Sequence, residues 1–205
     1  MSDFEQKDPN AVNSVPVTKP SKYGEIIDYI EILIIAICVV LAIFSFSGIR
    51  LCTVSGPSME QTLTNGENLI TSNVMYEPER GDIIVFHQTA DTEPSFNEPI
   101  VKRVIGLPGD TVYIDNFSSE VIVVDKNGNT VDLGEDNYKY VVDSNPYAIG
   151  YMAVKVEEGT VFVMGDNRNH SADSRDQRIA LVDTRRILGK VIFRATPFSK
   201  IGPVE

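Results

Sequence analysis

An uninterrupted run of uncharged, mostly apolar residues over Ile32–Ile49 is the feature that most constrains this chain. As an α-helix, this run extends about 27 Å, which is close to the thickness of a bilayer's hydrocarbon core. A cleaved signal peptide, with Ser45 and Ser47 as small cleavage-site residues, is a competing interpretation. However, the run is long for such a peptide and begins well inside the chain. A buried globular helix is a weaker third interpretation. We therefore predict a retained transmembrane anchor over residues 25–49.

The residues before this run are polar, contain several prolines and show no periodic apolar face. This composition predicts a disordered tail over residues 1–24. Lys19 and Lys22 precede the apolar run, whereas Arg50 alone follows it closely. Because positively charged flanks favour the cytoplasmic side, we predict a cytoplasmic tail and an extracytoplasmic β-domain over residues 50–205.

Beyond Cys52 the chain contains many short apolar or alternating stretches, separated by turn-forming residues. An Asn127-Gly128 pair between two of them predicts a β-hairpin. Together the stretches predict a single all-β domain, either a sandwich or a distorted barrel. One short helical turn is expected over Asp183–Ile187. The predicted strands are Leu69–Met75, Asp82–Phe86, Val101–Ile105, Val121–Val124, Thr130–Leu133, Tyr138–Val142, Met152–Val156, Thr160–Met164 and Lys190–Ala195, and the predicted surface loops are His87–Pro99 and Asp143–Gly150.

The composition argues against several kinds of partner and cofactor. A net charge of −11 makes nucleic acid an unsuitable partner, and the acidity is spread along the chain as on a solvated surface. Cys38 lies inside the apolar run and Cys52 just beyond it, so we expect no disulfide between them. The two histidines and two cysteines are not clustered, so zinc-site spacing is absent from the sequence.

The stretch Ser55–Leu63 reads SGPSMEQTL and places Ser58 directly after Gly56 and Pro57. Glycine and proline favour a tight bend, which can present one hydroxyl and leave neighbouring N–H groups free. An exposed Oγ atom and N–H donors for an oxyanion are two requirements of a serine nucleophile. Taken alone, however, this composition favours an ordinary turn.

Three further stretches follow in order: GDIIVF at Gly81–Phe86, VKRVIGLPGD at Val101–Asp110 and GDNRNHSADSR at Gly165–Arg175. With the Ser58 stretch and the apolar run before it, this ordered set resembles the type I signal peptidases, in particular the shorter Gram-positive type. Members of that family are membrane-tethered serine endopeptidases that remove signal peptides from exported proteins. The resemblance implies a β-domain of the signal-peptidase type, with exported preproteins as substrates and contact with membrane lipid. It implies no metal or organic cofactor.

Lys102 shares a strand face with the apolar Ile100 and Val104, which is unusual for a lysine. The strand pattern alone favours an edge lysine that prevents aggregation, with Arg103 on the opposite face as a solvent-facing or ion-paired residue. The resemblance instead implies that Lys102 is the general base that activates Ser58. Only a neutral amine accepts the serine proton, and burial lowers the pKa of lysine from its usual value of about 10.4.

The resemblance also implies supporting roles around the serine and lysine. Ser171 matches a hydroxyl that hydrogen-bonds to the lysine amine and orients it. Asp173 and Arg175 match an ion pair that holds the polar loop, and Asp166 and Arg103 match a pair that joins this loop to the lysine strand. Removal of such supporting groups should loosen the site without deleting its chemistry.

Leu63, Ile100 and Val101 match positions that line shallow pockets for small side chains, one and three residues before the cleaved bond. The sequence departs from the family pattern at two positions. Gln61 stands where proline is usual, which softens the bend after Ser58. Gly56 stands where some members carry a serine that helps to bind the oxyanion. The oxyanion would then depend mainly on the backbone N–H of the nucleophile.

Three rival interpretations remain open beside the Ser-Lys enzyme. A self-cleaving repressor-type protease would need a DNA-binding module, for which the acidic N-terminal segment is too short. A non-catalytic tethered β-domain would make the lysine and the polar loop structural, with Asx turns accounting for Asn167 and Asn169. A Ser-His enzyme would use His87 or His170 as its base.

Overall fold

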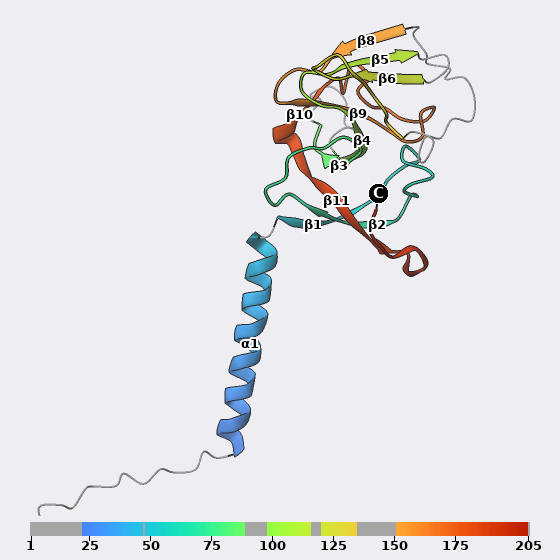
Figure 1. The fold of residues 1–205 in the computed structure, drawn as a ribbon. Coiled ribbons are helices and arrows are strands. Elements are labelled where there is room, and N and C mark those ends of the chain that lie inside the picture. The colour runs from blue at the N-terminus through green and yellow to red at the C-terminus, as the bar shows by residue number, and fades with distance from the viewer. Residues whose placement is uncertain (1–21, 47, 89–97, 116–119, 135–150, 205) are drawn as a thin grey trace, which may run out of the picture. The chain divides into compact units, whose positions relative to one another are not determined.

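The computed structural model describes residues 22–46, 48–88, 98–115, 120–134 and 151–204. The chain divides into two units, one that ends at Ile43 and one that begins at Phe44. Helix α1 (Lys22–Phe46) begins inside the predicted polar tail and ends before Ile49 (Figure 1). Within the described part of the chain, no helix meets the combined length and apolarity needed to cross a membrane. The transmembrane anchor therefore stays a prediction.

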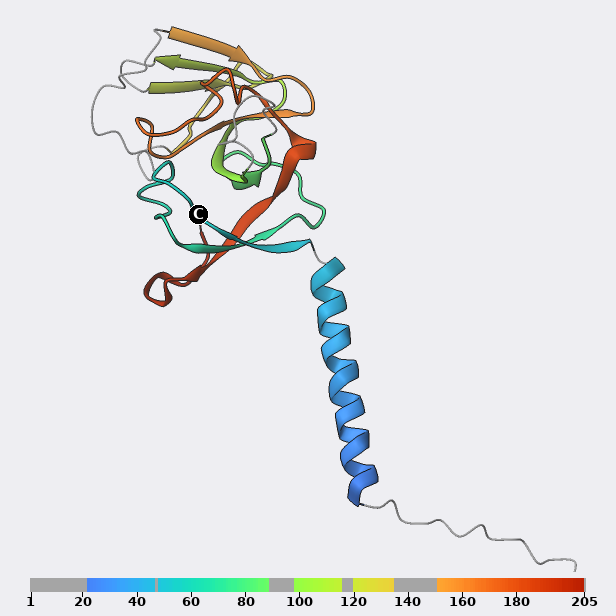
Figure 2. The same ribbon diagram turned by 180° about the vertical axis from the view of Figure 1, so that it is seen from behind.

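The predicted all-β class is confirmed in its coarse form, because the second unit is built mainly of strands in two antiparallel sheets. The larger sheet has the order β1-β2-β11-β3-β4-β9-β10 and is curled (Figures 1 and 2). Its strand β11 lies between β2 and β3, although it comes last in the sequence. The strands are β1 (Ile49–Thr53), β2 (Asn68–Ser72), β3 (Ile83–Phe86), β4 (Ile100–Gly106), β9 (Thr160–Met164), β10 (Val182–Asp183) and β11 (Ile187–Thr196).

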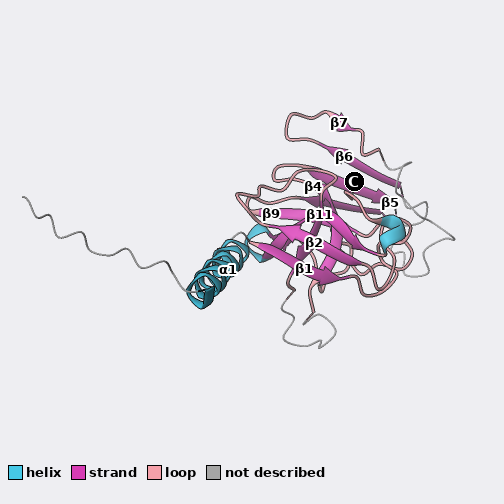
Figure 3. Ribbon diagram, turned by 90° about the horizontal axis from the view of Figure 1, so that it is seen from below, coloured by secondary structure: helices cyan, strands magenta, loops and turns pink. Residues whose placement is uncertain are grey.

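The smaller sheet has the order β7-β6-β5-β8 and lies at the opposite end of this unit from β1 and β2 (Figures 1 and 3). Strands β6 and β7 form the predicted hairpin around Asn127-Gly128, with Val124 paired to Thr130. Gly128 has a φ of 87°, a conformation that favours glycine. The strands are β5 (Thr111–Asp115), β6 (Glu120–Val124), β7 (Thr130–Val131) and β8 (Tyr151–Lys155).

Most predicted strands occur with shifted ends, and three observed strands were not predicted. Strand β2 ends at Ser72, short of the predicted Met75, which lies 95% exposed in a turn. Strands β1, β5 and β10 are absent from the sequence-based prediction. The predicted helical turn is confirmed as the 3-10 helix η3 (Thr184–Arg186), and a second such turn, η4 (Phe198–Lys200), follows β11. The predicted strand Tyr138–Val142, the predicted loop Asp143–Gly150 and residues 89–97 of the loop His87–Pro99 lie outside the described residues.

Strand β4 is the place where three hydrophobic clusters meet. Val104 belongs to a cluster with Ile84 and Phe86, and Val101 belongs to a second cluster. Ile105 belongs to a third cluster, beneath the smaller sheet. Every residue of β4 after the first is buried, so a charged side chain on this strand is removed from water by its position alone.

Candidate active site

Ser58 lies on the loop of residues 54–67, which joins β1 to β2 and which we call the serine loop. The loop is closed at its neck by hydrogen bonds from the Val54 N–H to the Glu67 carbonyl (2.8 Å) and from the Gly66 N–H to the Val54 carbonyl (2.9 Å). Its interior is anchored by Met59 and Leu63, whose side chains are wholly buried. Loops of this length whose ends lie close together are usually packed by their own side chains, as this one is.

Lys102 approaches the serine loop from β4, where it pairs with Ile84 of β3. Its side chain is almost completely buried, with 3% of the residue's surface exposed. The Nζ atom lies 2.8 Å from the Ser58 Oγ atom and 2.8 Å from the carbonyl oxygen of Val101, in hydrogen-bonding geometry with both. Ser58 is only partly buried, so its hydroxyl lies between the solvent and the buried amine of Lys102.

Burial changes the charge state that Lys102 favours. Removal of the ammonium from water lowers the pKa of Lys102 from 10.5 to about 8. The carboxylates of Asp173 and Asp166 oppose this shift because they stabilise the ammonium, whereas the Arg175 guanidinium adds to it. A lysine with a pKa near 8 has a substantial neutral population near neutral pH, and only the neutral amine accepts a proton.

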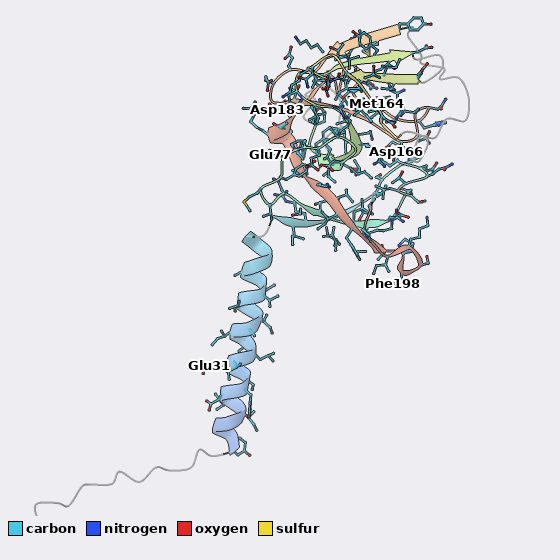
Figure 4. The ribbon with its side chains drawn as sticks, in the orientation of Figure 1. Glu31, Glu77, Met164, Asp166, Asp183 and Phe198 are labelled. Atoms are coloured by element: carbon cyan, nitrogen blue, oxygen red, sulfur yellow. The ribbon has the colours of Figure 1, made fainter. Side chains whose placement is uncertain are left out.

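The polar loop of residues 165–175 follows β9 and is joined to β4 by a buried ion pair. The Arg103 Nε and Nη2 atoms donate to the two carboxylate oxygens of Asp166 over 2.9 and 2.8 Å. Both side chains are nearly inaccessible, so the predicted solvent-facing alternative for Arg103 is wrong. The Thr62 hydroxyl also donates to Asp166, which ties the serine loop to the same pair. Figure 4 labels Asp166 near Met164, the last residue of β9.

A second buried pair holds the far end of the polar loop. Asp173 is wholly buried and accepts hydrogen bonds from Arg175 and from the Gly165 N–H. Although burial by itself raises the pKa of Asp173, the neighbouring Arg175 charge and these hydrogen bonds hold that pKa below its usual value. Ser171 lies beside this carboxylate. Its Oγ atom is buried, and among the described residues it meets the geometry of a hydrogen bond with none, Lys102 included.

The polar loop is also fastened directly to the backbone around Ser58. The Asn167 N–H donates to the Ser58 carbonyl (3.1 Å), and the Asn167 Nδ2 atom donates to the Pro57 carbonyl (3.1 Å). Gly165 fits against the same segment, because a Cβ atom there would collide with the Ser58 carbonyl oxygen and with Ser171 Oγ. Two segments far apart in the sequence are thus interlocked at the serine.

The three predicted substrate-pocket residues lie in two places. Leu63 and Val101 are buried in one hydrophobic cluster, and Leu63 exposes no surface. Ile100 is half-buried and packs against a different cluster. Their predicted role in binding substrate stays a prediction. Among the described hydrogen bonds, no histidine side chain contacts Ser58; His170 is exposed and His87 is half-buried.

Three residues of this site were missed from the sequence: Thr62, Gly165 and Asn167. The non-catalytic interpretation assigned Asn167 to an Asx turn, but its side-chain amide instead donates to the Pro57 carbonyl, more than a hundred positions earlier. Thr62 and Gly165 do stand inside the two recognised motifs, which was the available indication. Across the described positions, no group of three or more His, Cys, Asp or Glu side chains could hold a metal ion.

Fold and site together define a mostly β protein in which a serine and a buried lysine share a hydrogen bond. The family model for signal peptidase, peptidase S26, matches residues 26–196. Signal peptidase IB of Staphylococcus aureus (strain COL) is 33% identical over 190 residues, which cover 86% of this chain and 92% of that relative. Signal peptidase I of Bacillus licheniformis is 35% identical over 187 residues, which cover 88% and 94% of the two chains. The chain therefore belongs to the signal peptidase family, peptidase S26.

A solved structure, a signal peptidase I from Enterococcus faecalis V583, shares 26% identity and covers 57% of this chain and 97% of that one. Its TM-score of 0.39 is too low to establish a shared fold, so the family assignment depends on the sequence matches.

Proposed function

We propose that this protein is a serine endopeptidase that removes signal peptides from exported preproteins, with Ser58 as nucleophile and Lys102 as general base. The observation that carries the proposal is the 2.8 Å contact between Lys102 Nζ and Ser58 Oγ, made by a lysine whose pKa burial lowers to about 8. Membership of the signal peptidase family supplies the substrate class.

The reaction begins with neutral Lys102, which accepts the proton of the Ser58 hydroxyl as Oγ attacks the carbonyl carbon of the scissile peptide bond. The charge that develops on the carbonyl oxygen is stabilised by the backbone N–H of Ser58. The lysine then delivers its proton to the leaving amine, which becomes the N-terminus of the mature protein. An acyl-enzyme with the signal peptide remains. Lys102 then takes a proton from a water molecule as its oxygen attacks the ester carbonyl, and it returns that proton to the Ser58 Oγ atom as the bond to the acyl group breaks.

The two buried ion pairs hold the groups that surround this chemistry. Arg103 and Asp166 join the polar loop to the lysine strand, and Asp173 and Arg175 hold its far end. Ser171 lies with them, and its buried hydroxyl is available to orient the amine during the reaction. Each group acts by keeping the side chains of Lys102 and Ser58 within hydrogen-bonding distance of each other.

An extended substrate points alternate side chains in the same direction. Leu63, Ile100 and Val101 would line the pockets for the first and third residues before the cut. Small residues would be required there.

We further propose that residues 25–49 anchor the enzyme in the membrane, with residues 1–24 cytoplasmic and residues 50–205 forming the extracytoplasmic catalytic domain. The uncharged run and the exposed apolar side chains of α1 support this proposal. Substrates would then be met at the outer membrane–water boundary, beside lipid.

The test is incubation of the full chain, purified in detergent, with a preprotein, followed by N-terminal sequencing of the product. We expect one cut, directly after the signal peptide. The Ser58→Ala and Lys102→Arg variants should remain folded and lose cleavage to a similar extent, because members of one catalytic unit are non-additive. Arginine keeps the positive charge but cannot accept the proton.

A folded Lys102→Arg protein with a near-normal rate would return Lys102 to a structural role. Absence of any cleavage by the parent protein would favour a non-catalytic tethered β-domain. Labelling of Ser58 by a serine-acylating inhibitor separates these two outcomes.

A further inference from the structure

The carbonyl oxygen of the peptide bond between Pro57 and Ser58 accepts two hydrogen bonds. The Pro57 carbonyl accepts from the Glu60 N–H (3.1 Å) within the serine loop and from Asn167 Nδ2 (3.1 Å) in the polar loop. The next carbonyl, that of Ser58, accepts from the Asn167 N–H (3.1 Å). One residue therefore holds both carbonyls that flank the Cα atom of the nucleophile.

The orientation of the Asn167 carboxamide follows from its partner. A carbonyl oxygen only accepts hydrogen bonds, so the carboxamide atom that faces the Pro57 carbonyl must be the Nδ2 donor. The residue is 2% exposed, and its Oδ1 atom is buried without a hydrogen-bond partner among the described residues. An unsatisfied buried acceptor costs about 1–3 kcal/mol. The Asn167 side chain therefore donates to the Pro57 carbonyl through Nδ2, although this orientation leaves its own Oδ1 atom without a hydrogen bond.

The direction of the Pro57 carbonyl also fixes the direction of the Ser58 N–H. The Pro57–Ser58 peptide is trans, since the one cis bond in the described chain lies elsewhere. In a planar trans peptide the C=O and N–H bonds point in opposite directions, so a carbonyl held in place holds the N–H as well. No described group accepts a hydrogen bond from the Ser58 N–H. This donor is therefore free for an oxyanion.

Gly56 makes this backbone donor more important. Having no side chain, Gly56 supplies no second donor beside the nucleophile. Preorganised donors stabilise a developing oxyanion because they need not reorient during the reaction. Where one donor carries most of this stabilisation, the group that fixes its direction affects the rate directly.

We propose that Asn167 is a positioning residue that orients the Ser58 N–H toward the oxyanion of the tetrahedral intermediate. The inference deepens the proposed function and rests on it. Among the described hydrogen bonds, Asn167 makes none with the Ser58 Oγ atom or the Lys102 Nζ atom, and it acts through the Pro57–Ser58 peptide. Its backbone bond to Ser58 survives side-chain substitution, so a side-chain variant isolates the Nδ2 contact.

The test compares Asn167→Asp and Asn167→Ala with the parent enzyme on a preprotein and on a substrate-like peptide aldehyde. The aldehyde adds to Ser58 and forms a tetrahedral oxyanion. Asn167→Asp keeps the shape but places a carboxylate oxygen against the carbonyl. For both variants we expect kcat to fall by about 10- to 100-fold with KM nearly unchanged, since loss of a whole oxyanion donor costs roughly 100- to 1,000-fold. Aldehyde affinity should fall by a similar factor, while the midpoint of the pH–rate profile stays in place because Lys102 is untouched.

Titration with a serine-acylating inhibitor counts competent molecules, so rates are expressed per folded enzyme. Equal weakening of aldehyde and substrate binding, an unchanged kcat, a shifted pH midpoint, or failure of both variants to fold would each overturn the proposal. The parent and Ser58→Ala proteins are assayed beside them. If the parent does not cleave, the proposed function itself has failed; if it cleaves in a Ser58-dependent way, the Asn167 result stands by itself.

Discussion

Lys102 places an ionisable amine where the fold would otherwise hold an apolar side chain. Because burial lowers its pKa from 10.5 to about 8, the folded state must carry a poorly hydrated ammonium at lower pH. Between these two pKa values the unfolded chain binds more protons than the folded one, so stability rises with pH across that window. The cost of the ammonium is fully present below pH 8 and is relieved as the pH rises toward 10.5.

We therefore predict that Lys102→Met stabilises the protein while abolishing cleavage. The gain below pH 8 should approach about 3 kcal/mol, because burial lowers the pKa of Lys102 from 10.5 to about 8, and it should shrink between pH 8 and 10.5. Urea unfolding of parent and variant at pH 6.5 and pH 9.5 measures it. Lys155→Met, at an exposed position of β8, is the matched control and should show no comparable gain. A less stable Lys102→Met protein would contradict the burial argument.

The same pKa predicts how the rate depends on pH. If the neutral amine of Lys102 is the proton acceptor, as proposed, kcat/KM should rise as the pH increases and should level off above a midpoint near 8. Measurement of initial rates from pH 6 to 10 determines this midpoint. A midpoint near 6.5, the usual pKa of histidine, would instead favour a Ser-His enzyme. The His87→Ala and His170→Ala variants, which should keep the parent profile, complete the test.

At the residue scale, motif resemblance linked Ser58 with Lys102, whose side chains lie 2.8 Å apart, but it left the surroundings of this pair unknown. Ser58 and Lys102 could be predicted to act together because each lies in a motif whose order along the chain matches the family. The contacts that Gly165 and Asn167 make with the backbone around Ser58 could not be predicted in the same way. They depend on how closely two loops approach in space, which no local pattern encodes.

At the scale of elements, Gly106 of β4 lies where the larger sheet packs tightly against residues of the smaller one. A Cβ atom there would lie 2.7 Å from Val112 Cγ2 and 2.9 Å from Val156 Cγ2. Valine side chains are stiff, so they cannot move away cheaply. Because residue 106 has no side chain, Val112 of β5 and Val156, which directly follows β8, can pack against β4.

We predict that Gly106→Ala costs about 1–3 kcal/mol through overpacking. Val112→Ala should also destabilise the protein, because it leaves a cavity. The double variant should be more stable than the sum of the two effects implies, since the new methyl group partly fills the vacated space. Urea denaturation of all four proteins yields the coupling energy. Strict additivity would mean that the two residues do not compete for the same space.

Strand prediction succeeded for a continuous apolar run bounded by turns and failed for β1, β5 and β10. Strand β9 occurs with the predicted ends, as an apolar run bounded by turns. Strand β1 was missed because the apolar run of α1 continues into it; the break comes at Gly48, whose φ of 61° favours glycine and follows the helix end. Strand β5 was predictable, since Val112 and Ile114 are buried and Tyr113 between them is exposed.

At the scale of the whole molecule, the proposed topology predicts which residues an external protease reaches. When the chain is expressed in bacteria and the wall is removed, protease added to intact cells should cleave beyond Arg50 and spare the tail before Lys22. Lys19 and Lys22 favour the cytoplasmic side for that tail. Immunoblotting against tags at the two ends of the chain detects which end survives the protease. Lysed cells, in which both ends should be digested, provide the control. Digestion of the tail alone in intact cells would reverse the orientation.

The place of β11 in the larger sheet bears on when the enzyme becomes active. If the chain passes through the membrane in sequence order, as the proposed topology implies, the serine loop and β4 arrive long before Ile187–Thr196. Until that strand arrives, β2 and β3 lack the neighbour that they share. Pairing across such sequence distances is slow, because loop-closure entropy must be overcome first. Under the proposed topology and activity, a molecule still in transit would therefore carry Ser58 and Lys102 without the complete sheet that aligns them, and its proteolytic activity would begin only when its own passage was nearly complete.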